Sequence, residues 1–334
     1  MNIYDISQKA GVSIATVSRV LNKSKNVSAK TRQKVLDVME KDGYQPNAFA
    51  RGLTLNTMKT IGLLCADTSD PYLGSAISYL EQGLRAHSYD SLLGCTGYEL
   101  AQKEDRLNRI LSRHVDALIL IGSSFIEKND KKNDYLYRAA SQVPLLLLNG
   151  LLPGDNIYSS LCDDEEATFH AVTRLIKSGC ETPLFLYRSE SFSGIRKRTG
   201  FEKALEQMGI PLRKEQILMY SNTPHAVCLT LQKLYEQLHF DAVLTSDDEL
   251  AIGVLKFARA AGLSIPDDLS VIGYNNSILS VCCNPELTSI DNRLEYLCNS
   301  SVSLLMDLLD GKSAPGKTIV SADIVLRGTT RKGF

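Results

Sequence analysis

From Lys59 onward the chain alternates short apolar runs with longer amphipathic stretches, and this alternation constrains the fold more than any other feature. The apolar runs have the length and composition of buried strands and cover Ile61–Cys65, Leu92–Cys95, Ala117–Ile121, Leu145–Leu148, Leu184–Tyr187, Ile217–Met219, Ala242–Thr245 and Val271–Tyr274. The stretches between them have helical spacing and include Tyr72–His87, Lys103–Arg113, Ala167–Ser178, Thr199–Met208, His225–Gln237, Leu250–Ala261 and Leu294–Leu309. This pattern predicts an α/β body of βαβ units, with parallel sheets covered by helices on both faces.

The 334 residues are too many for one hydrophobic core, because single domains usually have ~100–200 residues. The number of predicted strands, with a change of domain near residues 157–163, favours two doubly wound lobes over one sheet. We expect one lobe to comprise about residues 58–160 plus 292–320, and the other about 161–291 plus 321–334. A small ligand would bind at the carboxyl ends of the strands, in the cleft between the lobes.

Residues 1–45 differ from the body, because they contain helical patterns and no convincing strand. The first pattern, Tyr4–Ala10, is broken by Gly11, and Ser13 can cap a second helix over Ile14–Asn22. A third helix can begin after Ser28 and continue to Gly43. Short helices joined by a tight turn that contains glycine predict an all-α helix-turn-helix domain.

The formal net charge of −1 conceals an asymmetry between the two parts of the chain. Residues 1–60 contain ten lysines and arginines and four acids, a net charge of +6, so the remainder carries −7. A basic head on an acidic body indicates that the head meets a polyanion. Charge alone leaves open the alternative of a solvated basic face that has no partner.

Several classes of protein are disfavoured by what the sequence lacks. No apolar run approaches the ~18 residues of a membrane helix, and Asp5 and Lys9 interrupt any signal peptide, so we expect a soluble, cytoplasmic protein with no membrane partner. The eight cysteines form no CxxC pair and the five histidines have no metal spacing, so no metal or cofactor is expected.

Residues 311–318, GKSAPGKT, match the phosphate-binding pattern GxxxxGKS/T, but a helical pattern precedes them and a strand-like run, Thr318–Leu326, follows. A phosphate-binding loop requires the opposite order, so a helix-to-strand turn is the better interpretation.

The second helical pattern has the properties of a helix that reads DNA. Such a helix needs a capped start, small or apolar groups for thymine methyls, and an arginine for guanine. The side chains expected on its exposed face are Ile14, Ala15, Ser18, Arg19 and Asn22. The residues themselves leave open a helical bundle that docks a protein.

Residues 3–22, IYDISQKAGVSIATVSRVLN, resemble the helix-turn-helix of the LacI/GalR repressor family, whose pattern is DVAxxAGVSxxTVSRVLN. The similarity continues through residues 27–35, which resemble the family's VSxxTRxKV. By this resemblance the residues that read bases are Ile14, Ala15 and Arg19. The residues that it implies hold phosphates are Ser13, Thr16, Ser18, Asn22, Asn26 and Ser28.

Residues 44–53 resemble the family's hinge pattern YxPNxxARxL, so residues 46–57 are expected to form a hinge helix and linker. Pro46 suits the first turn of a short helix over Asn47–Leu55. In the family this helix folds on the operator and enters the minor groove. The corresponding residues here are Asn47, Ala50, Arg51 and Leu53, with Leu53 as the wedge between base pairs.

The body, residues 58–334, resembles the family's periplasmic-binding-protein-like effector domain at residues 61–73, 193–201, 246–253, 270–276 and 285–290. The resemblance implies an effector site formed by Asp70, Tyr72, Leu73, Asn149, Arg196, Lys197, Asp247 and Asn275. Asn275 replaces the family's usual aspartate, and residues 196–198 supply three cations in a row. These departures favour an anionic effector, such as a sugar acid or sugar phosphate. The alternative is that Arg196 and Arg198 point into solvent and only Lys197 matters.

Together these features predict a transcriptional regulator, most simply a repressor of carbohydrate-related genes. We expect a homodimer that binds double-stranded, pseudo-palindromic operator DNA and responds to a small carbohydrate-like effector. Two alternatives are an α/β small-molecule enzyme, for which no catalytic residues are recognised, and a ligand sensor whose helical head binds a protein partner.

Overall fold

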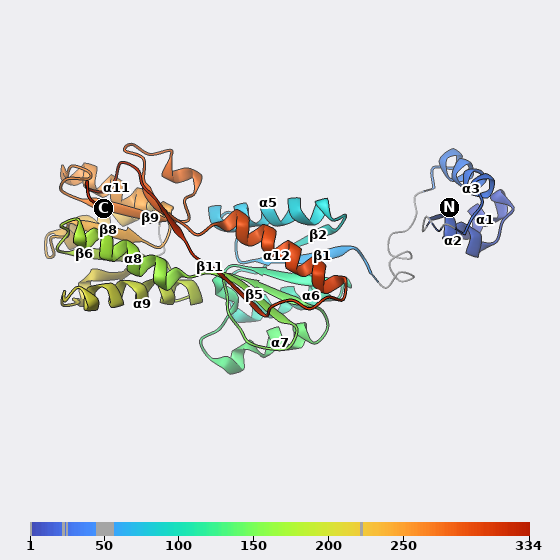
Figure 1. The fold of residues 1–334 in the computed structure, drawn as a ribbon, viewed down its shortest axis with the longest axis horizontal. Coiled ribbons are helices and arrows are strands. Elements are labelled where there is room, and N and C mark those ends of the chain that lie inside the picture. Colours follow the sequence, from blue (N-terminus) through green and yellow to red (C-terminus); the bar gives the residue numbers. More distant parts are fainter. Residues whose placement is uncertain (1, 22–23, 25, 45–56, 221–222) are drawn as a thin grey trace. The chain divides into compact units, whose positions relative to one another are not determined.

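The computed structural model describes the chain except for residues 1, 22–23, 25, 45–56 and 221–222, and it divides into two compact units, Met1–Lys59 and Thr60–Phe334. The expected hinge helix over Asn47–Leu55 and the proposed phosphate holder Asn22 lie outside the described residues. Each unit is described here by itself (Figure 1).

The N-terminal unit contains α1 (Ile3–Ala10), α2 (Ile14–Leu21) and α3 (Ala29–Lys41). Gly11 ends α1 with a φ of 59°, a left-handed conformation that glycine adopts without steric cost. The three helices share a core that consists of Ile6, Ala10, Val17, Val20, Val35 and Met39. This arrangement confirms the expected helix-turn-helix head.

One lobe of the larger unit contains a six-stranded parallel sheet in the order β11-β5-β4-β3-β1-β2. Its strands are β1 (Thr60–Cys65), β2 (Asp90–Cys95), β3 (Ala117–Ile121), β4 (Leu145–Leu148), β5 (Ile157–Cys162) and β11 (Lys317–Val320). One face packs against α5 (Pro71–Ala86) and α12 (Leu294–Leu309), and the other against α6 (Leu100–Leu111) and α7 (Asp134–Ala140). The 3₁₀ turns η1 (Ser123–Phe125) and η2 (Asp130–Asn133) lie between β3 and α7.

The other lobe contains a six-stranded sheet in the order β12-β10-β9-β8-β6-β7, in which only β12 is antiparallel to its neighbour. Its strands are β6 (Pro183–Tyr187), β7 (Ile217–Met219), β8 (Ala242–Thr245), β9 (Ser270–Tyr274), β10 (Thr288–Asp291) and β12 (Asp323–Val325). One face packs against α8 (Asp164–Lys177) and α9 (Phe192–Gln207), and the other against α10 (Pro224–Tyr235) and α11 (Asp248–Ala261). Short 3₁₀ turns, η3 (Lys214–Gln216) and η4 (Ile278–Ser280), complete this lobe.

The chain passes between the lobes at three places, from β5 to α8, from β10 to α12, and from β11 to β12. Figure 1 shows the red C-terminal segment running from β11 toward the lobe that contains β9. Each lobe is therefore assembled from segments that are far apart in the sequence.

The expected fold class, a helix-turn-helix head with two doubly wound lobes, is confirmed. Four of the predicted strands, including Ala117–Ile121 and Ala242–Thr245, have the bounds that the sequence indicated. The strand-like run Thr318–Leu326 is two strands, β11 and β12, and they belong to different sheets. Residues 311–316 lie between α12 and β11, and Lys317 and Thr318 begin β11, as expected for a helix-to-strand turn. Among the helices that the structure describes, none has both the length and the hydropathy to cross a membrane.

Candidate nucleic-acid interface and inter-lobe site

The helix α2 separates a buried side from an exposed one. Val17 and Val20 are 0% and 3% exposed and hold α2 against the other two helices. Ile14 is 40% exposed, and Ala15 and Arg19 are exposed as well. The exposed side of α2 thus presents an apolar side chain, a small side chain and a guanidinium. The buried valines on its other side hold the helix in place.

Two helices of the head begin with the same local structure. Ser13 Oγ accepts a hydrogen bond from the backbone N–H of Thr16 at 3.2 Å, and Ser28 Oγ accepts one from Thr31 N–H, also at 3.2 Å. In both pairs the serine and threonine hydroxyls are 2.9 Å apart. The start of a helix presents free N–H groups and the positive end of its dipole, so both starts suit phosphate groups. Of the other proposed phosphate holders, Asn26 is exposed and Ser18 is half-buried.

In the body, the loop after β1 forms one wall of a polar site between the lobes, which we call the inter-lobe site. Asp70 caps α5, because its Oδ1 accepts hydrogen bonds from the N–H groups of Tyr72 at 2.8 Å and Leu73 at 3.1 Å. The Tyr72 hydroxyl accepts a hydrogen bond from Asn149 Nδ2. Asn149 follows β4 with a φ of 62°, and its Oδ1 is buried without a hydrogen-bond partner among the described residues.

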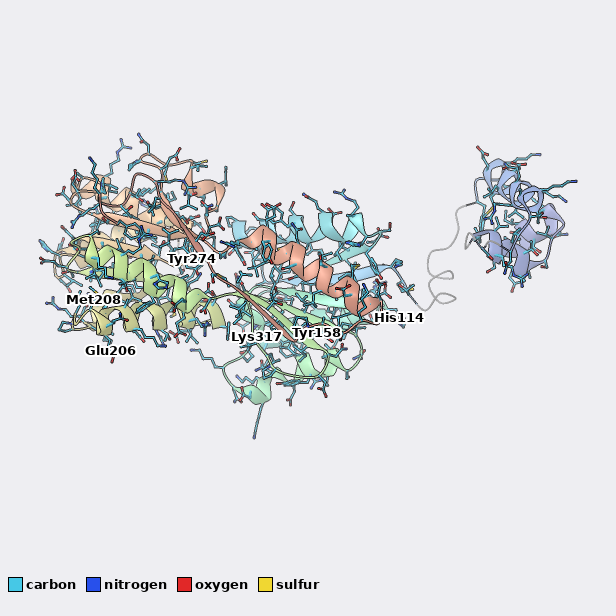
Figure 2. The ribbon with its side chains drawn as sticks, in the orientation of Figure 1. His114, Tyr158, Glu206, Met208, Tyr274 and Lys317 are labelled. Carbon is cyan, nitrogen blue, oxygen red and sulfur yellow. The ribbon has the colours of Figure 1, made fainter. Side chains whose placement is uncertain are left out.

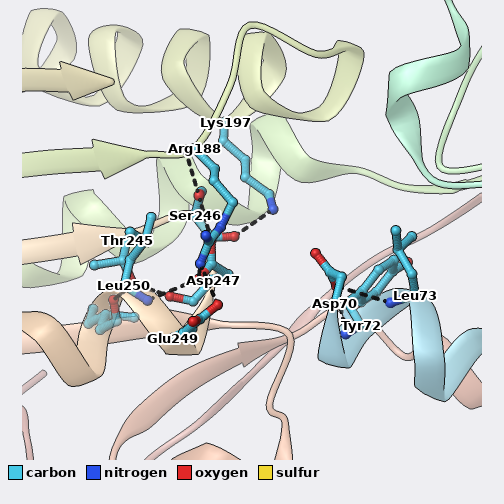
Figure 3. Close-up of polar contacts among 11 residues, drawn as sticks. Asp70, Tyr72, Leu73, Arg188, Lys197, Thr245, Ser246, Asp247, Glu249 and Leu250 are labelled. Carbon is cyan, nitrogen blue, oxygen red and sulfur yellow. Dashed lines mark hydrogen bonds and ion pairs between the residues drawn. The ribbon is translucent and has the colours of Figure 1, made fainter. Parts of the chain in front are cut away.

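The opposite wall belongs to the other lobe (Figure 3). Arg188, directly after β6, donates to both carboxylate oxygens of Asp247 at 2.9 Å and to Glu249 Oε2 at 2.8 Å. Asp247 also caps α11 by accepting a hydrogen bond from Leu250 N–H. Lys197, which is 7% exposed, donates to the Ser246 carbonyl at 3.0 Å. These side chains occupy the carboxyl end of their sheet, as expected of a ligand site in a doubly wound fold.

The charge of Arg188 is stabilised by carboxylates from both walls. Burial opposes this charge, but hydrogen bonding to Asp247 and attraction by Asp247, Glu249 and Asp70 raise the pKa of Arg188 above its usual value. Asp70 comes from the other lobe, so the two walls are close enough to influence each other electrostatically.

A buried polar cluster supports the Lys197 side chain. The ammonium lies 3.6 Å from the centre of the Tyr274 ring, a cation–π geometry. The Tyr274 hydroxyl donates to Asp164 Oδ1 at 2.6 Å, and Ser193 Oγ donates to Asp164 Oδ2 at 2.5 Å. Burial raises the pKa of Tyr274 well above its usual value, so the phenol stays a hydrogen-bond donor. In Figure 2, Tyr274 lies at the end of its lobe next to the other lobe, whereas Glu206 and Met208 lie at the far end.

Two of the three consecutive cations at residues 196–198 form ion pairs with acids of their own lobe. Arg196 pairs with Asp163 at 2.7 Å and with Glu165 at 3.3 Å, and both acids belong to the start of α8. Arg198 pairs with Glu190 at 2.5 Å. Successive residues of an α-helix point ~100° apart, so residues 196–198 cannot all face one site. Lys197 is the member of the run that lies with Arg188 and Asp247.

The remaining site residue that the sequence indicated, Asn275, follows β9 with a φ of 89°. Its Oδ1 accepts a hydrogen bond from Asn292 Nδ2 at 3.0 Å, so it contacts the segment that crosses between β10 and α12. The sequence reasoning missed Arg188 and the pair of Asp164 and Tyr274. Arg188 directly follows a predicted strand, Leu184–Tyr187, as Asn149 follows Leu145–Leu148, and this position was the available signal.

Two side-chain contacts join the lobes directly. Ser123 Oγ in η1 donates to Ser191 Oγ at 3.0 Å. Lys128 Nζ, also between β3 and α7, lies 2.7 Å from Glu190 Oε2 in the other lobe. Both contacts bridge the lobes, so a change in the arrangement of the lobes would break them.

Comparisons with known proteins agree with this architecture. Residues 2–47 match the family described as bacterial regulatory proteins, lacI family, and residues 172–330 match the periplasmic binding protein-like domain. The chain is 53% identical over 331 residues to an HTH-type transcriptional regulator of Lachnoclostridium phytofermentans, with 99% of each chain covered. It is 32% identical over 293 residues to catabolite control protein A of Priestia megaterium, with 87% of each covered.

A solved structure of the lac repressor dimer, bound to operator and an anti-inducer, has a TM-score of 0.89 and 25% identity, and the alignment covers 99% of both chains. The curated relatives are transcriptional regulators rather than enzymes. The helix-turn-helix head, the two parallel-sheet lobes and these similarities lead to one assignment: the chain belongs to the LacI family of bacterial transcriptional regulators, with a periplasmic-binding-protein-like effector domain.

Proposed function

We propose that the chain is a cytoplasmic repressor of carbohydrate-related genes that binds a pseudo-palindromic operator as a homodimer. Its affinity for the operator would change when a small carbohydrate-like effector binds at the inter-lobe site. The lac repressor, whose structure aligns with nearly the whole chain, was solved as a dimer on its operator. A two-fold dimer matches two half-sites, which doubles each contact that one head makes.

The observation that carries the DNA-binding role is the exposed face of α2. Ile14, Ala15 and Arg19 point away from a buried core that fixes the helix, and the hydroxyl-capped starts of α2 and α3 suit phosphates. We assign base reading to these three residues. We assign phosphate contacts to Ser13, Thr16, Ser18, Asn22, Asn26 and Ser28, and minor-groove contacts to Asn47, Ala50, Arg51 and Leu53 of the hinge.

The test compares two variants of the full chain that each remove one positive charge from the head. Arg19→Ala should weaken binding to an operator selected from random duplex DNA by about 1–3 kcal/mol per half-site and relax preference at one base pair. Lys9→Ala is the matched control, because Lys9 pairs with Asp42 at 2.9 Å within the head. Fluorescence anisotropy titrations at one salt concentration measure both. Equal losses for the two variants, with operator preference unchanged, would refute the role of Arg19.

For the effector, we propose a carbohydrate-like molecule held by Asp70, Tyr72, Leu73, Asn149, Arg188, Lys197, Asp247 and Asn275. The Arg188 charge is already paired with Asp247 and Glu249, and this arrangement offers donors and acceptors to hydroxyl groups without a large net positive charge. The orphaned Asn149 Oδ1 is an acceptor that a ligand hydroxyl would satisfy. These features favour a neutral sugar over a sugar acid or phosphate, for which Lys197 would be the anchoring cation.

A thermal-shift screen of the full chain with neutral sugars, sugar acids and sugar phosphates tests this proposal. A ligand at 100 times its Kd stabilises the folded protein by about 2.7 kcal/mol, which such a screen detects readily. Asn149→Ala should abolish the shift, whereas Asn108→Ala, on the exposed face of α6, should retain it. Stabilisation by sugar acids alone, lost in Lys197→Met, would replace the neutral effector by an anionic one. A shift that survives Asn149→Ala would place the ligand elsewhere.

A further inference from the structure

Two cysteines end neighbouring strands at the edge of the inter-lobe site. Cys65 is the last residue of β1 and Cys95 is the last residue of β2, and the parallel register pairs them directly. Adjacent strands lie about 4.7–4.9 Å apart, which falls within the range of Cα separations that a disulfide spans. The backbone therefore already has the spacing that a bond between the two sulfurs needs.

The two side chains also share one face of the sheet. Cys65 packs in the cluster formed with α5, beside Leu63 and Ala76, and directly paired residues of parallel strands point to the same side. Burial raises the pKa of Cys65 to about 12, and the charge of Cys95 and a hydrogen bond to its thiol act in the same direction.

Exposure differs between the two sulfurs and assigns them different roles. Cys95 is exposed, with its Sγ 3.9 Å from Thr68 Oγ1 in the loop that leads to Asp70. Cys65 is fully buried, so Cys95 is the sulfur that a reagent in solution can reach. Of the other cysteines, Cys282 is also exposed, but it lies outside the strands, so no strand register pairs it with a second cysteine.

We propose that Cys65 and Cys95 form a reversible redox pair that a peroxide converts to an intramolecular disulfide. The Cys95 thiolate attacks one peroxide oxygen, the O–O bond breaks, and Cys95 becomes a sulfenic acid while the other oxygen leaves as water after taking up a proton. Cys65 sulfur then attacks the sulfenic sulfur, and the departing hydroxide takes the Cys65 thiol proton to form a second water. Two thiols and one peroxide thus give one disulfide and two waters, and an external thiol reverses the bond by exchange.

The bridge would act on the first loop of the inter-lobe site. The backbone N–H of Thr96 already donates to the Cys65 carbonyl at 2.9 Å, and Gly97 N–H donates to the Ala66 carbonyl at 3.0 Å. These bonds hold the two strand ends together, so the disulfide closes without separating them. The disulfide would restrict the start of the loop that carries Asp70. Oxidation of the two cysteines would thereby restrict one side of the proposed effector site.

Peptide mapping of the full chain after treatment with hydrogen peroxide tests the proposal. Free thiols are blocked by alkylation before trypsin digestion, which leaves Cys65 in peptide 60–85 and Cys95 in peptide 86–103. We expect these two peptides to be joined and to separate on reduction. Because thiols within one fold meet at an effective concentration far above that of micromolar protein, the joined pair should exceed intermolecular products at least about tenfold.

Variants separate this reaction from other oxidations. Cys95→Ser and Cys65→Ser should each abolish the joined peptides, whereas Cys282→Ser should leave them unchanged. Alkylation of both cysteines after peroxide treatment would overturn the proposal, and so would over-oxidised Cys95 beside an intact Cys65 thiol. A disulfide that joins two copies of peptide 86–103 would also overturn it. The readout needs neither operator nor effector, so its failure is distinguishable from failure of the proposed function.

Discussion

Replacing Tyr274 by phenylalanine removes one hydroxyl from a fully buried ring and leaves its packing in place. That hydroxyl donates to the carboxylate of Asp164 at 2.6 Å, and Asp164 is itself 3% exposed. Hydrogen bonds to charged groups contribute about 1.5–3 kcal/mol, and water cannot replace the lost donor at a buried site. We therefore expect Tyr274→Phe to lower the free energy of unfolding by about 1.5–3 kcal/mol.

Urea unfolding of the full chain, followed by circular dichroism, measures this loss. Tyr98→Phe is the matched control, because Tyr98 is 61% exposed and its substitution should change stability by less than about 0.5 kcal/mol. A double-mutant cycle with Asp164→Asn should give a coupling energy of about 0.5–3 kcal/mol. Equal midpoints for the two tyrosine variants, or no coupling to Asp164, would refute the reasoning.

Two further predictions concern the packing of α9 and the contact between the lobes. Gly200→Ala should destabilise the protein by about 1–3 kcal/mol or more, because the new Cβ would lie 2.2 Å from the Glu165 carbonyl oxygen. Thermal unfolding measures this loss, and Gly316→Ala is the control, because Gly316 has open space around it. The Glu190 pKa lies below its usual value, chiefly because Lys128 donates a hydrogen bond to it, so this contribution to stability is present at neutral pH and is lost as the pH falls through the lowered pKa. Glu190→Gln should therefore flatten the acid side of the Tm-against-pH profile, and a variant profile parallel to the wild type would contradict this.

The sequence predicted strands best where a run was both wholly apolar and of the length of a strand. The run ALILI at Ala117–Ile121 is a strand with the expected bounds, because strands buried on both faces are commonly continuous apolar runs. By contrast, β5 reads IYSSLC, and its buried Ser159 and Ser160 interrupt the apolar run, so the sequence did not predict this strand although it placed a change of domain nearby. The strand β10, TSID, was also not predicted, because it is short and polar. Its Thr288 and Ser289 are fully buried, and both form hydrogen bonds to other segments of the chain.

Sequence motifs indicated several candidate site residues, but Arg188 was missed although it directly follows a strand, and tertiary contacts decide the surroundings of the others. Asp70 and Asn149 were found from their place in a motif or after an apolar run. The sequence suggested that Arg196 would act beside Lys197, but the carboxylates of Asp163 and Glu165 engage it, and they come from a different helix. Ion-pair partners between helices depend on packing geometry, which a linear pattern does not encode.

The three passages of the chain between the lobes bear on how the protein is made. The sheet that starts with β1 gains its last strand only with residues 317–320, and the other sheet gains β12 only with residues 323–325. α12, which covers α5, is likewise translated more than two hundred residues after it. A ribosome must therefore deliver almost the whole chain before either lobe is complete. The helix-turn-helix head, by contrast, is translated before the lobes with all of its core residues and can fold long before either lobe is complete.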